Sequence, residues 1–91
     1  MKTSDQITKN HLEQLKAKCI IVWSKYQTDT RYYKEKTNRV KSIKHPEDAY
    51  ILINMFDWSN QKELWNLLTR EEQEEYREYF SKYVLMELGE I

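Results

Sequence analysis

Ala49-Tyr50-Ile51-Leu52-Ile53-Asn54-Met55-Phe56-Asp57-Trp58 is the longest apolar run of the chain, set between the polar segments His45-Pro46-Glu47-Asp48 and Ser59-Asn60-Gln61-Lys62. At helical pitch one face of the run is formed by Ala49, Leu52, Ile53 and Phe56. A helix that is apolar on nearly every side must be covered by other elements or by a partner. We therefore expect this stretch to form the central helix of the core.

The chain has 91 residues, the length of one domain, and 40% hydrophobic residues allow it to fold although 33% of its residues are charged. A single Gly and a single Pro leave few tight turns of the kind that hairpins use. We expect one all-α domain over residues 1–91, a compact bundle of four to five helices around the central apolar helix. An α+β fold with a hairpin near residues 19–37 is the alternative, because Ile, Val, Trp and Tyr there also suit strands.

The N-terminal half contains two helical patterns. The first is a series at spacings of three and four, preceded by the possible caps Thr3, Ser4 and Asp5: Leu12, Leu15, Cys19, Val22, Trp23 and Tyr26. Gln27-Thr28-Asp29-Thr30 predicts a break before a second helix from about Arg31 to Ile43, with Tyr33 and Val40 on its inner face. Because no Gly or Pro occurs before His45, one continuous helix over residues 4–44 is also possible.

The C-terminal half carries clear capping signals. Pro46 suits the first turn of the central helix. Asp57, Ser59 or Asn60 can cap a short helix that holds Leu64, Trp65, Leu67 and Leu68. Thr69-Arg70-Glu71-Glu72 predicts a capping box. The final helix is expected to place Tyr76, Phe80, Tyr83, Val84 and Leu88 on one face and to end at Gly89.

Charge divides the chain in two. Residues 1–45 contain eleven Lys or Arg and four Asp or Glu, whereas residues 46–91 contain four and eleven. A basic stripe on the second helix is formed by Arg31, Lys34, Asn38, Lys41 and His45. Either the two halves pack together and their charges attract weakly, or each half presents its field to a partner of opposite sign.

The residues of a catalytic or metal site are lacking. The two histidines, His11 and His45, are not spaced with Cys19 or a carboxylate as metal ligands. Cys19 belongs to the apolar series of the first helix, so we expect its thiol to be buried. Glu71, Glu74, Glu75 and Glu78 have basic neighbours and read as a solvated helix face. We expect no enzyme activity, no metal and no cofactor.

Binding is the expected function. Seven Tyr and three Trp are many for so short a chain, and both residue types are enriched at binding hot spots. We expect a small regulator or inhibitor that docks on a protein partner through these residues: Arg31, Tyr32, Lys34, Arg39, Lys41, Lys44 and Trp58. The alternative is a nucleic-acid-binding accessory protein that uses the basic stripe of residues 31–45, with Tyr32 or Tyr33 stacking on bases.

Three further expectations concern surroundings and self-association. Apolar residues left over from the core, Ile21, Ile51 and Trp58, are candidates for a homodimer seam. No apolar run reaches the roughly 20 residues that cross a membrane. The single Cys19 and a polar start without a signal peptide favour the cytoplasm. By association alone, the Lys-, Glu- and Tyr-rich composition resembles that of accessory proteins from viruses or mobile elements.

Overall fold

The computed structural model describes residues 9–91 of the protein. Its elements in chain order are α1 (Lys9–Trp23), η2 (Ser24–Tyr26), α2 (Thr30–Ser42), η3 (Pro46–Asp48), α3 (Ala49–Asn54), α4 (Trp58–Leu67), α5 (Arg70–Tyr76), η4 (Arg77–Tyr79) and α6 (Lys82–Glu87). The all-α prediction is confirmed. Residues 9–91 contain no strand, so the hairpin alternative near residues 19–37 is wrong.

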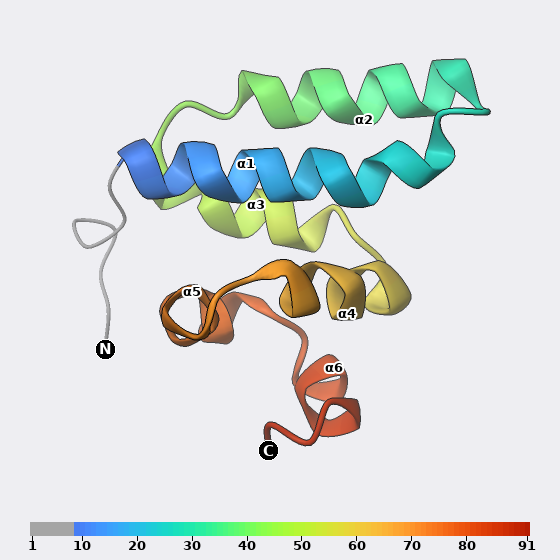
Figure 1. Ribbon diagram of the computed structural model, residues 1–91. Coiled ribbons are helices and arrows are strands. Elements are labelled where there is room, and N and C mark those ends of the chain that lie inside the picture. The colour runs from blue at the N-terminus through green and yellow to red at the C-terminus, as the bar shows by residue number, and fades with distance from the viewer. Residues whose placement is uncertain (1–8) are drawn as a thin grey trace.

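Helix α1 lies at the centre of the arrangement. It packs against α2 on one side and against α3 and α4 on the other, and α6 packs against α4 (Figure 1). Helix α2 therefore forms one edge of the molecule, and α6 lies at the opposite edge.

The core is where the apolar patterns predicted it. Ala49, Leu52, Ile53 and Phe56 are all buried, and so is the predicted series of the first helix except for Tyr26, which lies in η2 and is half-buried. The Phe56 ring stacks on Trp23, with 4.5 Å between the ring centroids. The prediction that residues 49–58 form one central helix is wrong, because α3 ends at Asn54, α4 begins at Trp58, and Tyr50 and Trp58 are exposed.

The break between the first two helices is also confirmed. Helix α1 ends in the 3-10 turn η2, and the Asp29 side chain caps α2 by accepting a hydrogen bond from the Tyr32 backbone N–H at 3.2 Å. One continuous helix over residues 4–44 is therefore wrong. The predicted caps Thr3, Ser4 and Asp5 lie outside the described residues.

Two of the C-terminal signals act as predicted. The Asp57 side chain caps α4 by accepting from Asn60 N at 2.8 Å. Thr69 and Glu72 form the full capping box of α5, each side chain accepting a hydrogen bond from the other residue's backbone N–H.

The predicted final helix is divided in two. Backbone at Phe80 is extended, and Ser81 caps a separate α6 through its side chain and the Tyr83 N–H. This division gives six α-helices in residues 9–91 where four to five were expected. Gly89 ends α6 with a φ of 76°, and the Glu90 N–H reaches the Leu85 carbonyl at 2.8 Å.

Candidate docking surface

Helix α2 is held to the molecule along one narrow face. Val40 and Thr37 are buried, and Tyr33 is half-buried against the core. At its C-terminal end the Lys16 ammonium of α1 donates to the Ile43 carbonyl at 2.7 Å, which satisfies a group that the helix leaves unpaired. The rest of the circumference of α2 is open to the surface.

We call the exposed part of this segment the basic surface: Arg31, Tyr32, Lys34, Arg39, Lys41 and Lys44. Each of these residues is exposed, so the structure places six of the seven predicted partner-binding residues on or directly after one helix. His45 does not continue the predicted stripe, because α2 ends at Ser42 and residues 43–45 leave the helix.

Basic side chains of α1 and η2 pair with acidic side chains of the C-terminal half. Lys18 pairs with Glu72, the Lys25 ammonium lies 2.7 Å from a Glu63 carboxylate oxygen, and His11 Nδ1 lies 3.4 Å from Glu75. Burial opposes ionisation of Glu72, but hydrogen bonds from Lys18 and Thr69 outweigh it and lower the pKa of that carboxyl. For α1 and η2, therefore, the two oppositely charged halves do pack together.

Of the four glutamates that were predicted to form a solvated helix face, Glu75 is buried and Glu74 is exposed. Glu75 is buried where α5 meets α1, so assigning it to a solvated face was wrong. Glu74 is exposed, and its carboxylate pairs with both Arg70 and Arg77.

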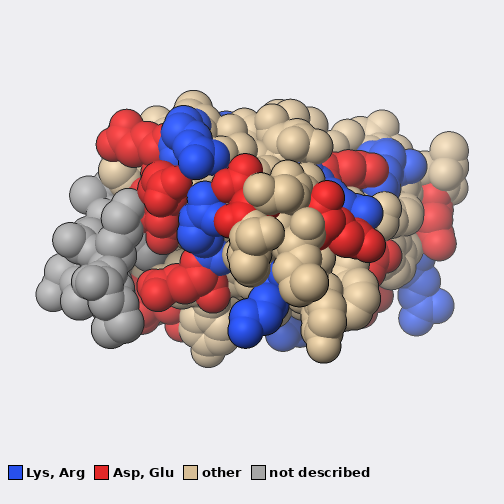
Figure 2. All heavy atoms as spheres, turned by 90° about the horizontal axis from the view of Figure 1, so that it is seen from below, with Lys and Arg blue, Asp and Glu red and all other residues tan. Residues whose placement is uncertain are grey.

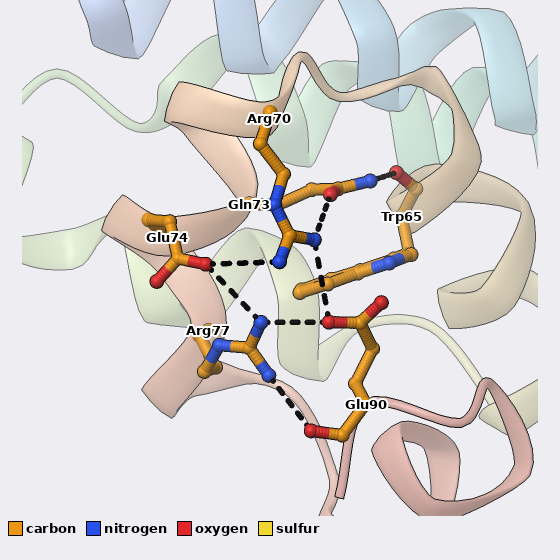
Figure 3. A network of polar contacts seen from close by, with 6 residues as sticks. All are labelled: Trp65, Arg70, Gln73, Glu74, Arg77 and Glu90. Carbon is orange, nitrogen blue, oxygen red and sulfur yellow. Dashed lines mark hydrogen bonds and ion pairs between the residues drawn. The ribbon is translucent and has the colours of Figure 1, made fainter.

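Within the acidic half, basic side chains pair with the carboxylate of Glu90. The Arg77 guanidinium donates to the Glu90 carboxylate at 2.7 Å and to the Glu90 backbone carbonyl at 3.2 Å, with its Cζ 5.3 Å from the Trp65 ring centre (Figure 3). The hydrogen bond from Arg77 lowers the pKa of Glu90. Arg70 joins the same group and Gln73 donates to the Trp65 carbonyl, which connects α4, α5 and the segment after α6.

Among the described residues, the basic surface lacks the ion pairs that are found on α1 and around Glu90. Within residues 9–91, no ion pair involves a charged side chain of α2 or Lys44. By contrast, six of the eleven acidic side chains of residues 46–91 have basic partners among the described residues: Glu63, Glu72, Glu74, Glu75, Glu87 and Glu90. Residues 30–45 carry six Lys or Arg and one Glu, so their positive field is directed to solvent.

An aromatic cluster fixes the N-terminal end of the basic surface. The Tyr32 ring lies 5.2 Å from Tyr26 and 5.9 Å from Trp23, and the Lys36 ammonium lies 5.4 Å from the Tyr32 ring centre. Burial, followed by the nearby Tyr26 and Asp57, raises the pKa of Tyr32. An aromatic ring in contact with Trp23 and Tyr26 therefore borders the positive charges.

Lysines surround a hollow at the other end of α2. The hollow, of about 370 Å³, lies between α1 and α2 and is lined by Lys9, Leu12, Glu13, Lys16, Lys41 and Lys44. Lys9 and Lys16 were not predicted to take part in the site. Their spacing of seven residues places them on one face of α1, but that pattern does not reveal which other helix the face meets.

Apolar side chains line the opposite flank of α2. Arg39 and Lys36 border a groove of about 390 Å³ together with Tyr50, Ile51, Asn54 and Met55 of the α3 segment. In the sequence, Tyr50 and Met55 belong to the apolar run 49–58 but not to its predicted inner face. Only the packing of α3 beside α2 shows that they lie next to basic residues.

Trp58 is separate from the basic surface. It begins α4 and its ring stacks on Tyr83 of α6. Helix α6 lies at the edge of the molecule opposite α2 (Figure 1). The predicted dimer seam is not brought together either, because Ile21, Ile51 and Trp58 line three different hollows.

Cys19 is buried, and burial raises the pKa of its thiol to about 12. Among residues 9–91, no three His, Cys, Asp or Glu side chains are grouped so that they could hold a metal ion. In the same part of the chain, every helix is too short or too polar to cross a membrane. Comparison with protein-family models, curated proteins and solved structures gives no match.

Proposed function

We propose that the chain is a small protein-interaction module, a regulator or inhibitor inside the cell, whose basic surface docks on an acidic face of a protein partner. One observation carries the proposal. The charged side chains of α2 have no ion-pair partner within residues 9–91, although acidic residues elsewhere in the fold are abundant and mostly paired. Charges arranged in this way steer a partner of opposite sign.

The groove beside α2 supports a protein partner. Tyr50 is exposed and Met55 half-buried, and both line the groove that Arg39 borders. Aromatic residues, Met and Arg are enriched at the centres of protein interfaces. An acidic partner segment with one or two apolar side chains would fit both flanks of α2, and a binding role of this kind needs no catalytic group.

Capture from the native host tests the proposal with matched variants. The test variant is Arg31→Gln, Lys34→Gln, Lys41→Gln. The control, Lys25→Gln, Arg70→Gln, Lys82→Gln, removes three positive charges from exposed positions on other elements. All of these side chains are exposed, so both variants should fold.

The expected result is a protein captured by the wild type and the control, after nuclease treatment, and absent with the test variant. With that partner purified, the test variant should associate about tenfold more slowly at low salt, and the salt dependence should flatten. Equal binding by the two variants would refute the role of the basic surface.

The lysine-lined hollow favours nucleic acid as a second candidate. Lys9, Lys41 and Lys44 around one concavity suit phosphate groups, and Tyr32 could stack on a base. A fluorescent single-stranded oligonucleotide should then bind, and the slope of log affinity against log salt should fall by roughly 0.7 for each phosphate group that the test variant no longer neutralises. Capture that disappears on nuclease digestion would favour this candidate, and nuclease-resistant capture would exclude it.

A further inference from the structure

A second exposed feature lies on α4 and α6, away from the basic surface. Trp58 is 52% exposed, Tyr83 61% and Met86 55%. The Trp58 and Tyr83 rings stack with 5.1 Å between their centroids and 28° between their planes. Met86 follows Tyr83 by three residues on α6, so the two side chains are neighbours on the helix surface.

The fold does not require these side chains to be apolar. Helix α6 attaches to the core through Val84 and Leu85, which are buried, while Tyr83 and Met86 are directed outward. With about half of each side chain exposed, Trp58, Tyr83 and Met86 present roughly 300 Å² of apolar surface. A contiguous patch of that size on a small protein is commonly an interaction site.

The charges beside the patch indicate what can cover it. Lys62 of α4 and Glu87 of α6 form an ion pair at 2.8 Å, with both side chains substantially exposed. The exposed Asp57 and Lys82 also lie beside Trp58 and Tyr83, so charges of both signs border the patch. Figure 2, which views the molecule from the side of α6, shows red and blue side chains interleaved between tan areas on this face.

A two-fold interface places the same surface of both copies in contact, so that surface must be complementary to itself. A patch bordered by charges of both signs meets this condition, because Lys62 of each copy can face Glu87 of the other. The basic surface fails the same condition, since residues 30–45 carry six basic residues and one acidic residue and would repel a second copy.

We propose that Trp58, Tyr83 and Met86 form the centre of a two-fold interface between two copies of this chain. The apolar centre is smaller than the roughly 800 Å² that each partner buries in a standard interface, so polar surroundings must complete it and the dimer should be weak. Both basic surfaces stay free in such a dimer, because α2 lies at the opposite edge of the molecule.

Sedimentation velocity over about 1–500 μM tests the interface. The wild type should shift from monomer to dimer, and Tyr83→Glu should weaken dimerisation at least tenfold, because two negative charges then meet near the axis. Tyr50→Glu is the matched control, an exposed tyrosine on α3 outside the patch, and should dimerise like the wild type. Circular dichroism confirms that each variant is folded, and Met86→Glu provides a second substitution at the patch.

A charge-reversal pair tests the two-fold arrangement itself. Lys62→Glu replaces the ion pair by two negative charges and Glu87→Lys by two positive charges, so each variant should repel its own copies and dimerise much more weakly than the wild type. Mixing the two should restore the dimer as a heterodimer. The proposal is overturned by a wild type that stays monomeric at 500 μM, by a dimer that Tyr83→Glu leaves unchanged, or by a mixture that remains monomeric. The Arg31→Gln, Lys34→Gln, Lys41→Gln variant should dimerise normally, which keeps this result separate from the docking proposal.

Discussion

Replacement of Gln61 by Leu should destabilise the protein although the residue is polar and the substitution is apolar. The Gln61 side chain is buried at the centre of three chain segments. Its amide Nε2 donates to the carbonyls of Ile53 at 3.4 Å and Phe56 at 3.3 Å, and its Oε1 accepts from the Ser81 N–H at 3.1 Å. One side chain thus joins the end of α3, the start of α4 and the start of α6.

The magnitude follows from what Leu leaves unpaired. Ser81 N–H loses its acceptor, which costs about 1–3 kcal/mol when the group stays buried. The two carbonyl hydrogen bonds are long and contribute less, and the Ile53 carbonyl keeps its bond from the Phe56 N–H. The adjoining hollow lets water approach the Ser81 N–H, which reduces the cost of leaving it unpaired. The loss of stability from all three hydrogen bonds together should therefore be about 2–3 kcal/mol. For a domain of this size that lowers Tm by about 10–20 °C.

Urea unfolding followed by circular dichroism at 222 nm measures the change, and Gln14→Leu, at an exposed position on α1, is the control. Amide hydrogen exchange should also show α6 opening first, because its attachment through Ser81 is removed. A difference of less than about 0.5 kcal/mol between the two variants would refute the role assigned to the Gln61 amide.

Three further predictions concern the core and the buried charges. Phe56→Ala should cost about 3–5 kcal/mol, since it removes the ring stacked on Trp23; a loss under about 1 kcal/mol in urea unfolding would show that this ring is not central. The Cys19 thiol, with its pKa raised to about 12, should resist a thiol-specific colour reagent at pH 8 until urea is added, and rapid reaction of the folded protein would contradict its burial. The lowered pKa of Glu72 contributes stability that is present above the pKa of the unfolded carboxyl and lost as pH falls through the folded value, so Lys18→Gln should reduce the difference in stability between pH 7 and pH 3; an unchanged difference would contradict the pairing.

Local signals predicted most of the fold. The capping box at Thr69, the cap at Asp57 and the glycine stop at Gly89 each depend on a few neighbouring residues, and all three are found. The division of the last helix was missed. It depends on Ser81, which has Val84 and not Glu or Gln three residues later and so gives no capping-box signal. It also depends on Gln61, which lies 20 residues earlier and can be matched to Ser81 only in three dimensions.

The basic surface could be predicted only in part, because only some of its features depend on neighbouring residues in the sequence. Exposure of Arg31, Lys34 and Lys41 follows from helical periodicity opposite Val40. The pairing of Lys18 with Glu72 and the placing of Tyr50 beside Arg39 depend on how α1, α3 and α5 pack. Periodicity shows which residues share one face of a helix, but it does not show which other helix that face contacts. The separation of Trp58 from α2 could therefore not be predicted.

The position of α2 at one edge gives this electrically neutral protein a pronounced dipole. At physiological ionic strength the Debye length is about 8 Å, whereas the molecule measures 38 × 29 × 17 Å. A partner that approaches α2 is therefore shielded from most of the acidic half and encounters a cationic object. Behaviour on a cation-exchange matrix should accordingly resemble that of a more basic protein than the pI of about 6.7 suggests, because retention depends on the edge that makes contact and not on the sum of the charges.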